Sequence, residues 1–312
     1  MRMRFLLLLL VLSIHALGNP ADEARPVDPG IAARLGQIAA LGAKPGSAAK
    51  LLEVLNDFEL TVCQSAAVAA LNEHPDPETG KGLLQRWRSI KPGARINAVQ
   101  LLVARPEWRS ALIEALEKGA VLPAELSLNQ TQRALLLDDK NSDLAKRAAK
   151  FFERREFAGR KKIIDTILKD LPDEGNLHDG NELYRQRCLI CHRHGRLGNA
   201  VGPDLSGELK RTAEEFITHF VDPNLVINPS FVTCEVTRKN GAKALGILAE
   251  ESLESVTLVK GIGLREVIPW QEIASFQTTP KSLMQEGLES GLSPTDFRSL
   301  VEFLQSVDPP AE

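Results

Sequence analysis

The stretch that decides how this chain folds is "ELYRQRCLICHRHGRLGNAVGPDLSG", which runs from Glu182 to Gly207. Within it, two residues separate Cys188 from Cys191, and His192 directly follows the second cysteine. This C-x-x-C-H pattern has three chemical interpretations: covalent attachment of haem, a zinc knuckle and a redox-active dithiol. The remaining sequence must decide among them.

Covalent haem attachment suits the spacing best. On one helical turn, both sulfurs can reach the two vinyl groups of a single macrocycle, and His192 is then carried beneath the ring to bind iron. A structural zinc site needs two further ligands, but there is no second cysteine pair, and His192 and His194 are too close together. A thioredoxin-like dithiol belongs to a βαβ unit, whereas this motif ends a predicted helix.

The first residues, "MRMRFLLLLLVLSIHALGNPADE", indicate export. Arg2 and Arg4 precede an apolar run, Phe5 to Ile14, that is too short to span a bilayer comfortably. We therefore predict a cleaved signal peptide over residues 1–18 and a periplasmic or otherwise exported protein. No cysteine follows the run to accept a lipid, so a lipoprotein is not expected. An uncleaved N-terminal anchor is the alternative.

The composition excludes several classes of protein. The net charge of −3 is small and mixed, so nothing indicates binding to nucleic acid. No segment after the signal peptide is apolar enough to cross a membrane. Four cysteines are too few for a disulfide scaffold. Cys63 and Cys234 are most simply buried thiols, and a bridge between them is the alternative.

Residues 29–172 are predicted to be helical almost throughout. Two segments, "AAVAALNEHPDPETGKGLLQRW" and "NAVQLLVARPEWRSALIEAL", superpose when Ala67-Val68 is matched to Ala98-Val99, a period of 98 − 67 = 31 residues. A helix, a proline-marked turn and a second helix at this period are typical of an α-solenoid of the HEAT type. An irregular helical bundle is the alternative.

A second domain is predicted over residues 176–310, after the linker "DLPDEGNLHDG". Thr212 and Glu215 form a capping box, and Ser293 caps a final helix that ends at Ser306. Between these helices, at about 228–280, the hydrophobic period changes to that of strands, with Asn240-Gly241 as a hairpin turn. We expect a five-strand meander there, forming a small barrel or a curled sheet.

Several features of this domain resemble a class I cytochrome c. They are Gly180 and Tyr184 before the motif, "VGPDLSG" (201–207) after it and "LVEFL" (300–304) near the end. The resemblance implies that Gly180 and Tyr184 let the first helix of the domain cross the last. It also implies that the Pro203 carbonyl accepts a hydrogen bond from Nδ1 of His192, which fixes the tautomer of the iron ligand.

The order of the motifs is similar, more narrowly, to the haem-binding domain widespread in Planctomycetes and Verrucomicrobia: "CLICHRHG…VGPDLSG…VDPNLVINPSF…V…NG…G…VTL…SLMQEGL". That family carries a β insertion before a Ser-Leu-Met-Pro-Glu-Gly-Leu segment, and helical sequence such as "RPEWRSALIEALEKG" commonly precedes it. Gln285 stands where the family usually has proline, which implies a less rigid backbone. The resemblance thus implies a mainly α, multidomain fold: a HEAT-like array, then a cytochrome c-type domain with a small antiparallel β insertion.

A candidate for the distal iron ligand follows from the sequence without the family resemblance. Met1 and Met3 lie in the predicted signal peptide, so Met284 is the only methionine of the mature chain. It precedes the final helix, as a distal thioether does in class I cytochromes. The rival ligands, which we consider weaker, are His178, His194 and His219.

These observations predict an electron carrier rather than an enzyme. One haem c, bound through Cys188, Cys191 and the axial ligands His192 and Met284, would exchange single electrons with a redox partner. In the family the domain is often fused to a dehydrogenase-like propeller, so the resemblance implies a separate dehydrogenase as one candidate partner. Four arginines around the motif are solvated, pair with haem propionates or form a docking patch for an acidic partner: Arg185, Arg187, Arg193 and Arg196.

Two other functions stay open. The first is a haem enzyme or a sensor of peroxide or a small gas, in which Met284 is displaced from the iron. The second is a helical-repeat scaffold that carries a haem, in which the N-terminal array performs the main task.

Overall fold

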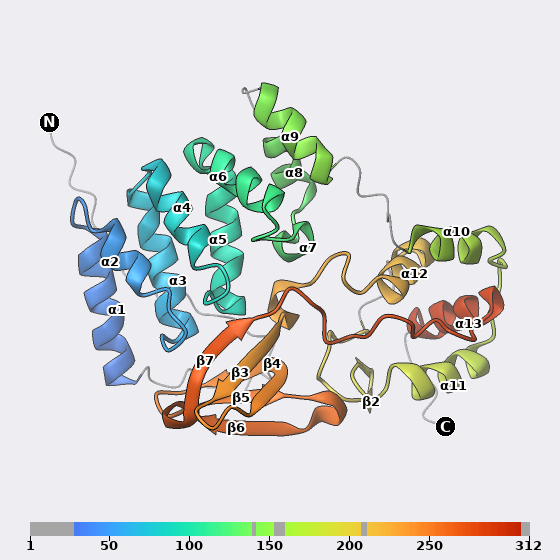
Figure 1. Cartoon of the computed structure of the whole chain (residues 1–312). Coiled ribbons are helices and arrows are strands. Elements are labelled where there is room, and N and C mark those ends of the chain that lie inside the picture. Colours follow the sequence, from blue (N-terminus) through green and yellow to red (C-terminus); the bar gives the residue numbers. More distant parts are fainter. Residues whose placement is uncertain (1–27, 139–141, 153–159, 207–210, 307–312) are drawn as a thin grey trace, which may run out of the picture.

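The computed structural model describes residues 28–138, 142–152, 160–206 and 211–306. This part of the chain is about half helical and holds a five-stranded antiparallel sheet, so the expectation of a mainly α fold with a β insertion is confirmed (Figure 1). The predicted signal peptide lies outside the described residues. No described helix is both long enough and apolar enough to cross a membrane.

The N-terminal helices stack in two layers, with consecutive helices alternating between them (Figure 1). One layer contains α1 (Pro29–Gly42), α3 (Thr61–Ala70), α5 (Pro92–Ala104) and α8 (Gln130–Leu137). The other contains α2 (Ala48–Glu53), α4 (Pro77–Gln85), α6 (Pro106–Glu117) and α9 (Ser142–Phe152). The short helix α7 (Pro123–Leu126) precedes α8. We call these nine helices the helical array.

The sequence repeat coincides with this stacking. Ala67 of α3 and Ala98 of α5, which the 31-residue offset equates, are both 0% exposed. Small residues let neighbouring helices of one layer approach closely. A Cβ on Gly80 of α4 would lie 2.6 Å from Cγ of Trp108 on α6, so a larger side chain there would push these helices apart.

Four helices form a second, separate core: α10 (Lys161–Lys169), α11 (Leu177–Arg187), α12 (Ala213–Val221) and α13 (Pro294–Leu304). The capping box expected at Thr212 and the N-cap expected at Ser293 are present, since each side chain accepts a hydrogen bond from the backbone three residues on. The sequence predicts a first domain over residues 29–172, which would include helix α10. Its Ile164 and Ile167 instead pack in this second core.

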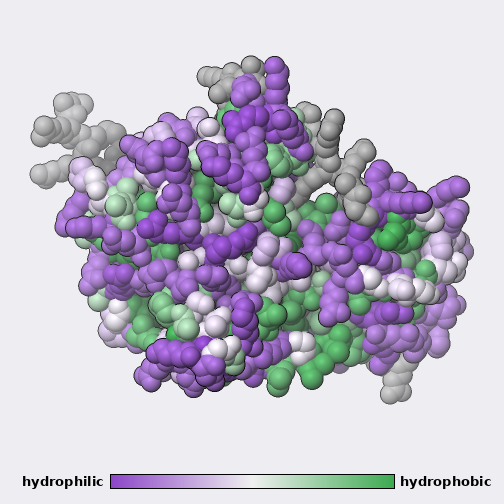
Figure 2. All heavy atoms as spheres, in the orientation of Figure 1, coloured by the Kyte–Doolittle hydropathy of each residue, from purple (hydrophilic) through white to green (hydrophobic). Residues whose placement is uncertain are grey.

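The sheet comprises β3 (Thr233–Arg238), β4 (Lys243–Glu251), β5 (Ser255–Val259), β6 (Arg265–Pro269) and β7 (Ile273–Thr278). The strand order is β6-β5-β4-β3-β7. The prediction of a simple meander is therefore wrong for the last strand, which returns across the sheet to pair with the first. As a result, β7 lies beside the helical array and β6 is the outer edge, where apolar surface gathers (Figures 1 and 2).

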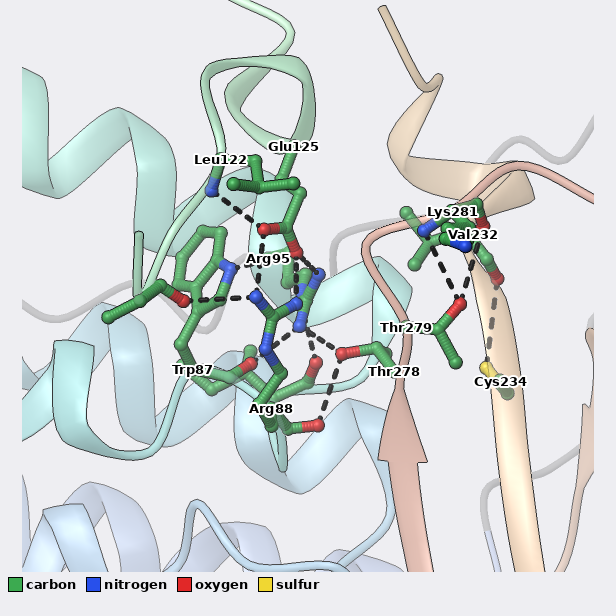
Figure 3. A network of polar contacts seen from close by, with 12 residues as sticks. Trp87, Arg88, Arg95, Leu122, Glu125, Val232, Cys234, Thr278, Thr279 and Lys281 are labelled. Atoms are coloured by element: carbon green, nitrogen blue, oxygen red, sulfur yellow. Dashed lines mark hydrogen bonds and ion pairs between the residues drawn. The ribbon is translucent and has the colours of Figure 1, made fainter. Parts of the chain in front are cut away.

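Buried ionic groups join the helical array to β7 (Figure 3). Glu125 of α7 is 1% exposed and accepts hydrogen bonds from Arg88, at 2.6 Å, and from Arg95, at 3.0 Å. Arg95 is 0% exposed and also donates to Oγ1 of Thr278, while the Thr278 backbone donates to the carbonyl of Arg88 at 2.9 Å. The array and the sheet therefore share one polar network.

A buried lysine makes a second connection. Lys91, 0% exposed, places Nζ 2.5 Å from Oε1 of Glu251 on β4 and 4.4 Å from the centroid of the Trp270 ring. Burial lowers the pKa of Lys91, and the charge of Glu251 opposes this shift. Burying an ammonium group without a partner is costly, so Glu251 of the sheet stabilises the charge of Lys91 in the array.

The cysteines are free thiols in this structure. Cys63 lies in the core of the array and Cys234 in the core of the sheet. The alternative of a bridge between them is therefore not realised.

Candidate functional site

The C-x-x-C-H motif forms a tight turn at the end of α11. Cys188 is the C-cap residue, and its carbonyl accepts hydrogen bonds from the backbone of Cys191, at 2.9 Å, and of His192, at 2.8 Å. These hydrogen bonds close one further turn after α11, and this turn contains both cysteines and the histidine. Cys188 is buried and Cys191 is half-buried.

The environment of the two thiols is not that of a reactive dithiol. Burial raises the pKa of Cys188 to about 12 and also raises that of Cys191. Dithiols of C-x-x-C oxidoreductases act through a thiolate whose pKa is lowered. Within the described ranges, no group of three or more His, Cys, Asp or Glu side chains is arranged to hold a metal ion, and a zinc knuckle needs four ligands.

The imidazole of His192 is held by one backbone contact. Its Nδ1 lies 2.8 Å from the carbonyl oxygen of Pro203, which is the contact that the resemblance implies. A carbonyl can only accept, so the proton is on Nδ1 and the lone pair is on Nε2. The described residues give Nε2 no hydrogen bond. This is the tautomer that a histidine ligand needs, with Nε2 free to bind a metal.

Two glycines bring the backbone of the following loop against His192. A Cβ on Gly202 would lie 2.5 Å from Cε1 of the imidazole, so only a glycine leaves room for the ring. Gly198 has φ +86, and a Cβ there would lie 2.0 Å from the carbonyl oxygen of His192. The loop thus holds both the ring and the backbone of His192, so the orientation of the imidazole is fixed by the chain itself.

Helices α11 and α13 cross at the point that the resemblance implies. A Cβ on Gly180 would lie 2.1 Å from the carbonyl oxygen of Ser299, so the helices touch backbone to backbone. One turn later, the ring of Tyr184 packs against that of Phe303, with 5.3 Å between the ring centroids. The hydroxyl of Tyr184 donates to the carbonyl of His192 at 2.7 Å, which connects the crossing to the motif.

His194 has a structural role in this crossing. It is 1% exposed. The centroid of its ring lies 5.9 Å from the ring centroid of Tyr184 and 5.1 Å from that of Phe303. Its Nε2 is 3.2 Å from the carbonyl oxygen of Phe303. Of the other rival ligands, His219 is half-buried on α12 and His178 is exposed. None of the three is held as His192 is.

Met284 belongs to the same core cluster as Cys188. It is half-buried and packs against the residues of the second core. Its backbone N–H donates to Oγ of Ser282 at 3.1 Å, and the backbone of Ser282 donates to Oδ1 of Asn224 at 2.8 Å. The amide of Asn224 in turn donates to Glu286 at 2.7 Å. Asn224 therefore holds the Met284 segment on both sides.

No pattern in the sequence marks Asn224. It lies in "VDPNLVINPSF", where the sequence showed only the end of a helix. Its partners are 58 and 62 residues away, so no local pattern marks its role. The one indication of a role for this segment is that it belongs to the motifs that resemble the haem-binding family.

The arginines around the motif have different partners. Arg193 pairs with Asp204, with Nε 2.7 Å from Oδ2, while Arg187 donates to the carbonyls of Leu288 and Ser290 at 3.5 and 3.4 Å. Arg185 donates to Asn181 at 3.2 Å. Arg196 is exposed. The positive charge of the motif is thus only partly compensated.

Neither the protein-family models nor the curated proteins with which the chain was compared include a match.

Proposed function

We propose that this protein is an exported c-type cytochrome that carries one covalently attached haem and exchanges single electrons with a redox partner. The observation that carries the proposal is the state of His192: its Nδ1 donates to the Pro203 carbonyl, Gly202 lies against its ring and the described residues give Nε2 no hydrogen bond. This arrangement occurs within a C-x-x-C-H turn, where haem attachment requires it.

The residues present fit a haem. Cys188 and Cys191 would supply the two thioether bonds, His192 the proximal ligand and Met284 the distal ligand. The fit rests on free thiols at both cysteines and on Met284 packing in the core that contains Cys188. When bound, the haem would supply the one-electron chemistry. A methionine ligand occupies the position where a substrate would bind and raises the reduction potential.

The chain's own residues would keep this site rigid and partly dry. Pro203 orients His192, Tyr184 anchors its carbonyl, and the apolar core excludes water from one side. Asn224 holds the Met284 segment, which offsets the absence of proline at Gln285. Rigid ligands favour electron transfer because little has to rearrange when the iron changes its charge.

We also propose that the helical array is an α-solenoid of the HEAT type. The two stacked layers and the 31-residue offset support this. The array is docked on the sheet through Glu125 and Lys91, whose buried contacts support a stabilising role.

Spectroscopy of the purified, exported protein tests the proposal. We expect a covalently attached haem that resists acid extraction and a low-spin reduced spectrum of the His/Met type. Met284→Ala should convert it to a high-spin form that binds carbon monoxide, while His219→Ala should leave the spectrum unchanged. A wild-type haem that is already high-spin and binds carbon monoxide readily would instead favour the enzyme or sensor.

A further inference from the structure

An open cavity lies where the helical array meets the sheet, and we call it the seam cavity. It has a volume of about 260 Å³ and is lined by α1, by the connection from α2 to α3, by Leu253 in the turn from β4 to β5 and by Trp270 after β6. A Cβ on Gly30 of α1 would lie 3.5 Å from Cδ1 of Leu253, so the array and the sheet touch at its edge. Figure 1 shows α1 and α11 at opposite ends of the molecule, so the seam cavity is separate from the C-x-x-C-H motif.

Aromatic and aliphatic side chains form most of the walls. The rings of Phe58 and Trp270 meet edge to face, with 6.5 Å between their centroids and 64° between their planes. Phe58 and Leu253 are 53% and 54% exposed and stand at the mouth, whereas Leu60 is buried at the base. An apolar cavity of about 150 Å³ holds a benzene molecule. The seam cavity therefore has room for two fused aromatic rings.

The wall that Trp270 forms is held in place from two sides. Its Nε1 donates to the carbonyl of Ser252 at 2.9 Å, and Nζ of Lys91 lies 4.4 Å from the centroid of its ring. Lys91 is itself bound to Glu251, with 2.5 Å between Nζ and Oε1. The indole ring is thus positioned by the chain alone, and a preformed wall lowers the cost of ordering the site when a ligand binds.

The two ionised side chains that line the seam cavity compensate each other. Arg34 donates to Oε2 of Glu59 from Nε, at 3.0 Å, and from Nη2, at 2.5 Å. The N-terminus of α1 does not attract an anion either, because the carboxylate of Asp28 accepts hydrogen bonds from the backbone of Gly30 and Ile31. An uncharged ligand therefore suits this site. A carboxylate can accept about four hydrogen bonds, and Arg34 supplies two to Glu59, so Glu59 can accept another from a ligand.

We propose that the seam cavity binds a small, uncharged aromatic molecule of two fused rings that carries a hydroxyl or N–H group. The rings would pack in the angle between Phe58 and Trp270, and the hydroxyl or N–H group would donate to Glu59. Because Phe58 belongs to the array and Trp270 follows a strand of the sheet, the ligand would contact both units. This inference does not depend on the proposed electron transfer.

Isothermal titration calorimetry of the purified, exported protein at neutral pH tests the proposal. The probes are 2-naphthol, which is uncharged and carries one hydroxyl, and 2-naphthoate, which has the same rings but is an anion. We expect one molecule of 2-naphthol to bind per chain, and 2-naphthoate to bind at least about tenfold more weakly because it would face Glu59. The absence of saturable binding of 2-naphthol, or equal affinities for the two probes, would overturn the proposal.

Phe58→Ala tests the aromatic wall. Phe58 is more than half exposed, so the variant should fold, and we expect its affinity for 2-naphthol to be about tenfold lower than that of the wild type. The matched control is Phe151→Ala, because Phe151 forms a similar ring pair with Phe152 on α9, with 6.4 Å between the centroids. This control should bind 2-naphthol as the wild type does. Equal affinities in the two variants would refute the site.

Glu59→Gln tests the charge of the seam cavity. The substitution keeps the shape of the side chain but leaves the charge of Arg34 without its partner, so 2-naphthoate should now bind more tightly than 2-naphthol. The control is Glu117→Gln, which breaks the pair with Arg147 elsewhere in the array, where Nη2 lies 2.7 Å from Oε2. It should keep the preference of the wild type. An unchanged preference in Glu59→Gln, or the same reversal in both variants, would place the binding elsewhere and contradict the proposal.

Discussion

At the scale of single residues, the candidate site depends on glycines, because a side chain at these positions would collide with the neighbouring backbone or with the ring of His192. Gly180, Gly198 and Gly202 each leave less than 3 Å between an added Cβ and the backbone or ring beside it. Such contacts are shorter than packed atoms tolerate, so these positions admit glycine alone. They fix the helix crossing and the orientation of His192 through backbone geometry rather than through side-chain chemistry.

Gly180→Ala should therefore destabilise the protein. The new methyl group would meet the Ser299 carbonyl oxygen, and separating α11 from α13 should cost about 1–3 kcal/mol in the free energy of unfolding. Urea titration followed by haem absorbance measures this. The control is Gly36→Ala in the middle of α1, where nothing lies within 4 Å; helix propensity should make it stabilising by up to about 1 kcal/mol. Similar effects at both positions would refute the close crossing.

The cysteines give a residue-scale test that also counts the haem bonds. Cys63 and Cys234 are 1% and 0% exposed, so a thiol reagent should not react with them at pH 8 in the native protein. After unfolding, two thiols should react, because the proposed thioether bonds to haem would occupy Cys188 and Cys191. Four reactive thiols in the unfolded protein would contradict haem attachment, and rapid reaction of the native protein would contradict the burial.

The same thiols make stability depend on pH. Burial raises the pKa of Cys63 from 9.0 to about 11. Above pH 9 the unfolded state loses this proton while the folded state keeps it, so the free energy of unfolding should fall as the pH rises from 9 to 11. The slope for one thiol is at most roughly 1.4 kcal/mol per pH unit. Urea titrations across this range should show a smaller slope for Cys63→Ala than for the wild type.

At the scale of elements, the sequence predicted what is local and missed what is distant. The caps at Thr212 and Ser293 and the Asn240-Gly241 turn involve residues only two or three positions apart, and all were visible in the sequence. The return of β7 to β3 was not visible, because neighbouring strands usually pair. Nor was the burial of Lys91, whose carboxylate partner lies 160 residues away.

The candidate site divides in the same way. The C-x-x-C-H spacing and the Pro203 contact could be expected, since His192 and Pro203 are 11 residues apart in a recognised motif. The clamp on the Met284 segment could not, because Asn224 and Ser282 are joined only when the β insertion folds between them. A single sequence indicates the candidate ligands, and only the tertiary structure shows which residues hold them in place.

Asn224→Ala should loosen the distal ligand without removing it. The variant loses the bonds to Ser282 and Glu286, so the Met284 segment should leave the iron more readily. We expect imidazole to displace Met284 with an affinity about tenfold higher than in the wild type, a change of roughly 1.4 kcal/mol. Optical titration with imidazole measures this. Asn240→Ala, which affects only the hairpin turn, is the control, and equal affinities in both variants would exclude a clamp.

At the scale of the whole molecule, the packing suggests two cooperative units rather than the two segments expected from the sequence. The array and the sheet share the Glu125 network and the Lys91 contacts, and Trp270 packs against both of their cores. Helices α10 to α13 and the motif have a core of their own. The sheet therefore lies within the second domain predicted from the sequence, but it shares its buried contacts with the array.

Glu125→Ala tests this division. It leaves Arg95, 0% exposed, without its carboxylate, and an uncompensated buried charge should cost about 3–5 kcal/mol. Thermal unfolding is followed by the fluorescence of Trp87, Trp108 and Trp270, which lie in the array and the sheet, and by haem absorbance. We expect the tryptophan transition to fall well below its wild-type temperature while the haem transition moves little. Glu117→Ala, which removes the more exposed pair with Arg147, should shift neither by much. If both transitions fell together in Glu125→Ala, the chain would be one cooperative unit, and the array would stabilise the haem core directly.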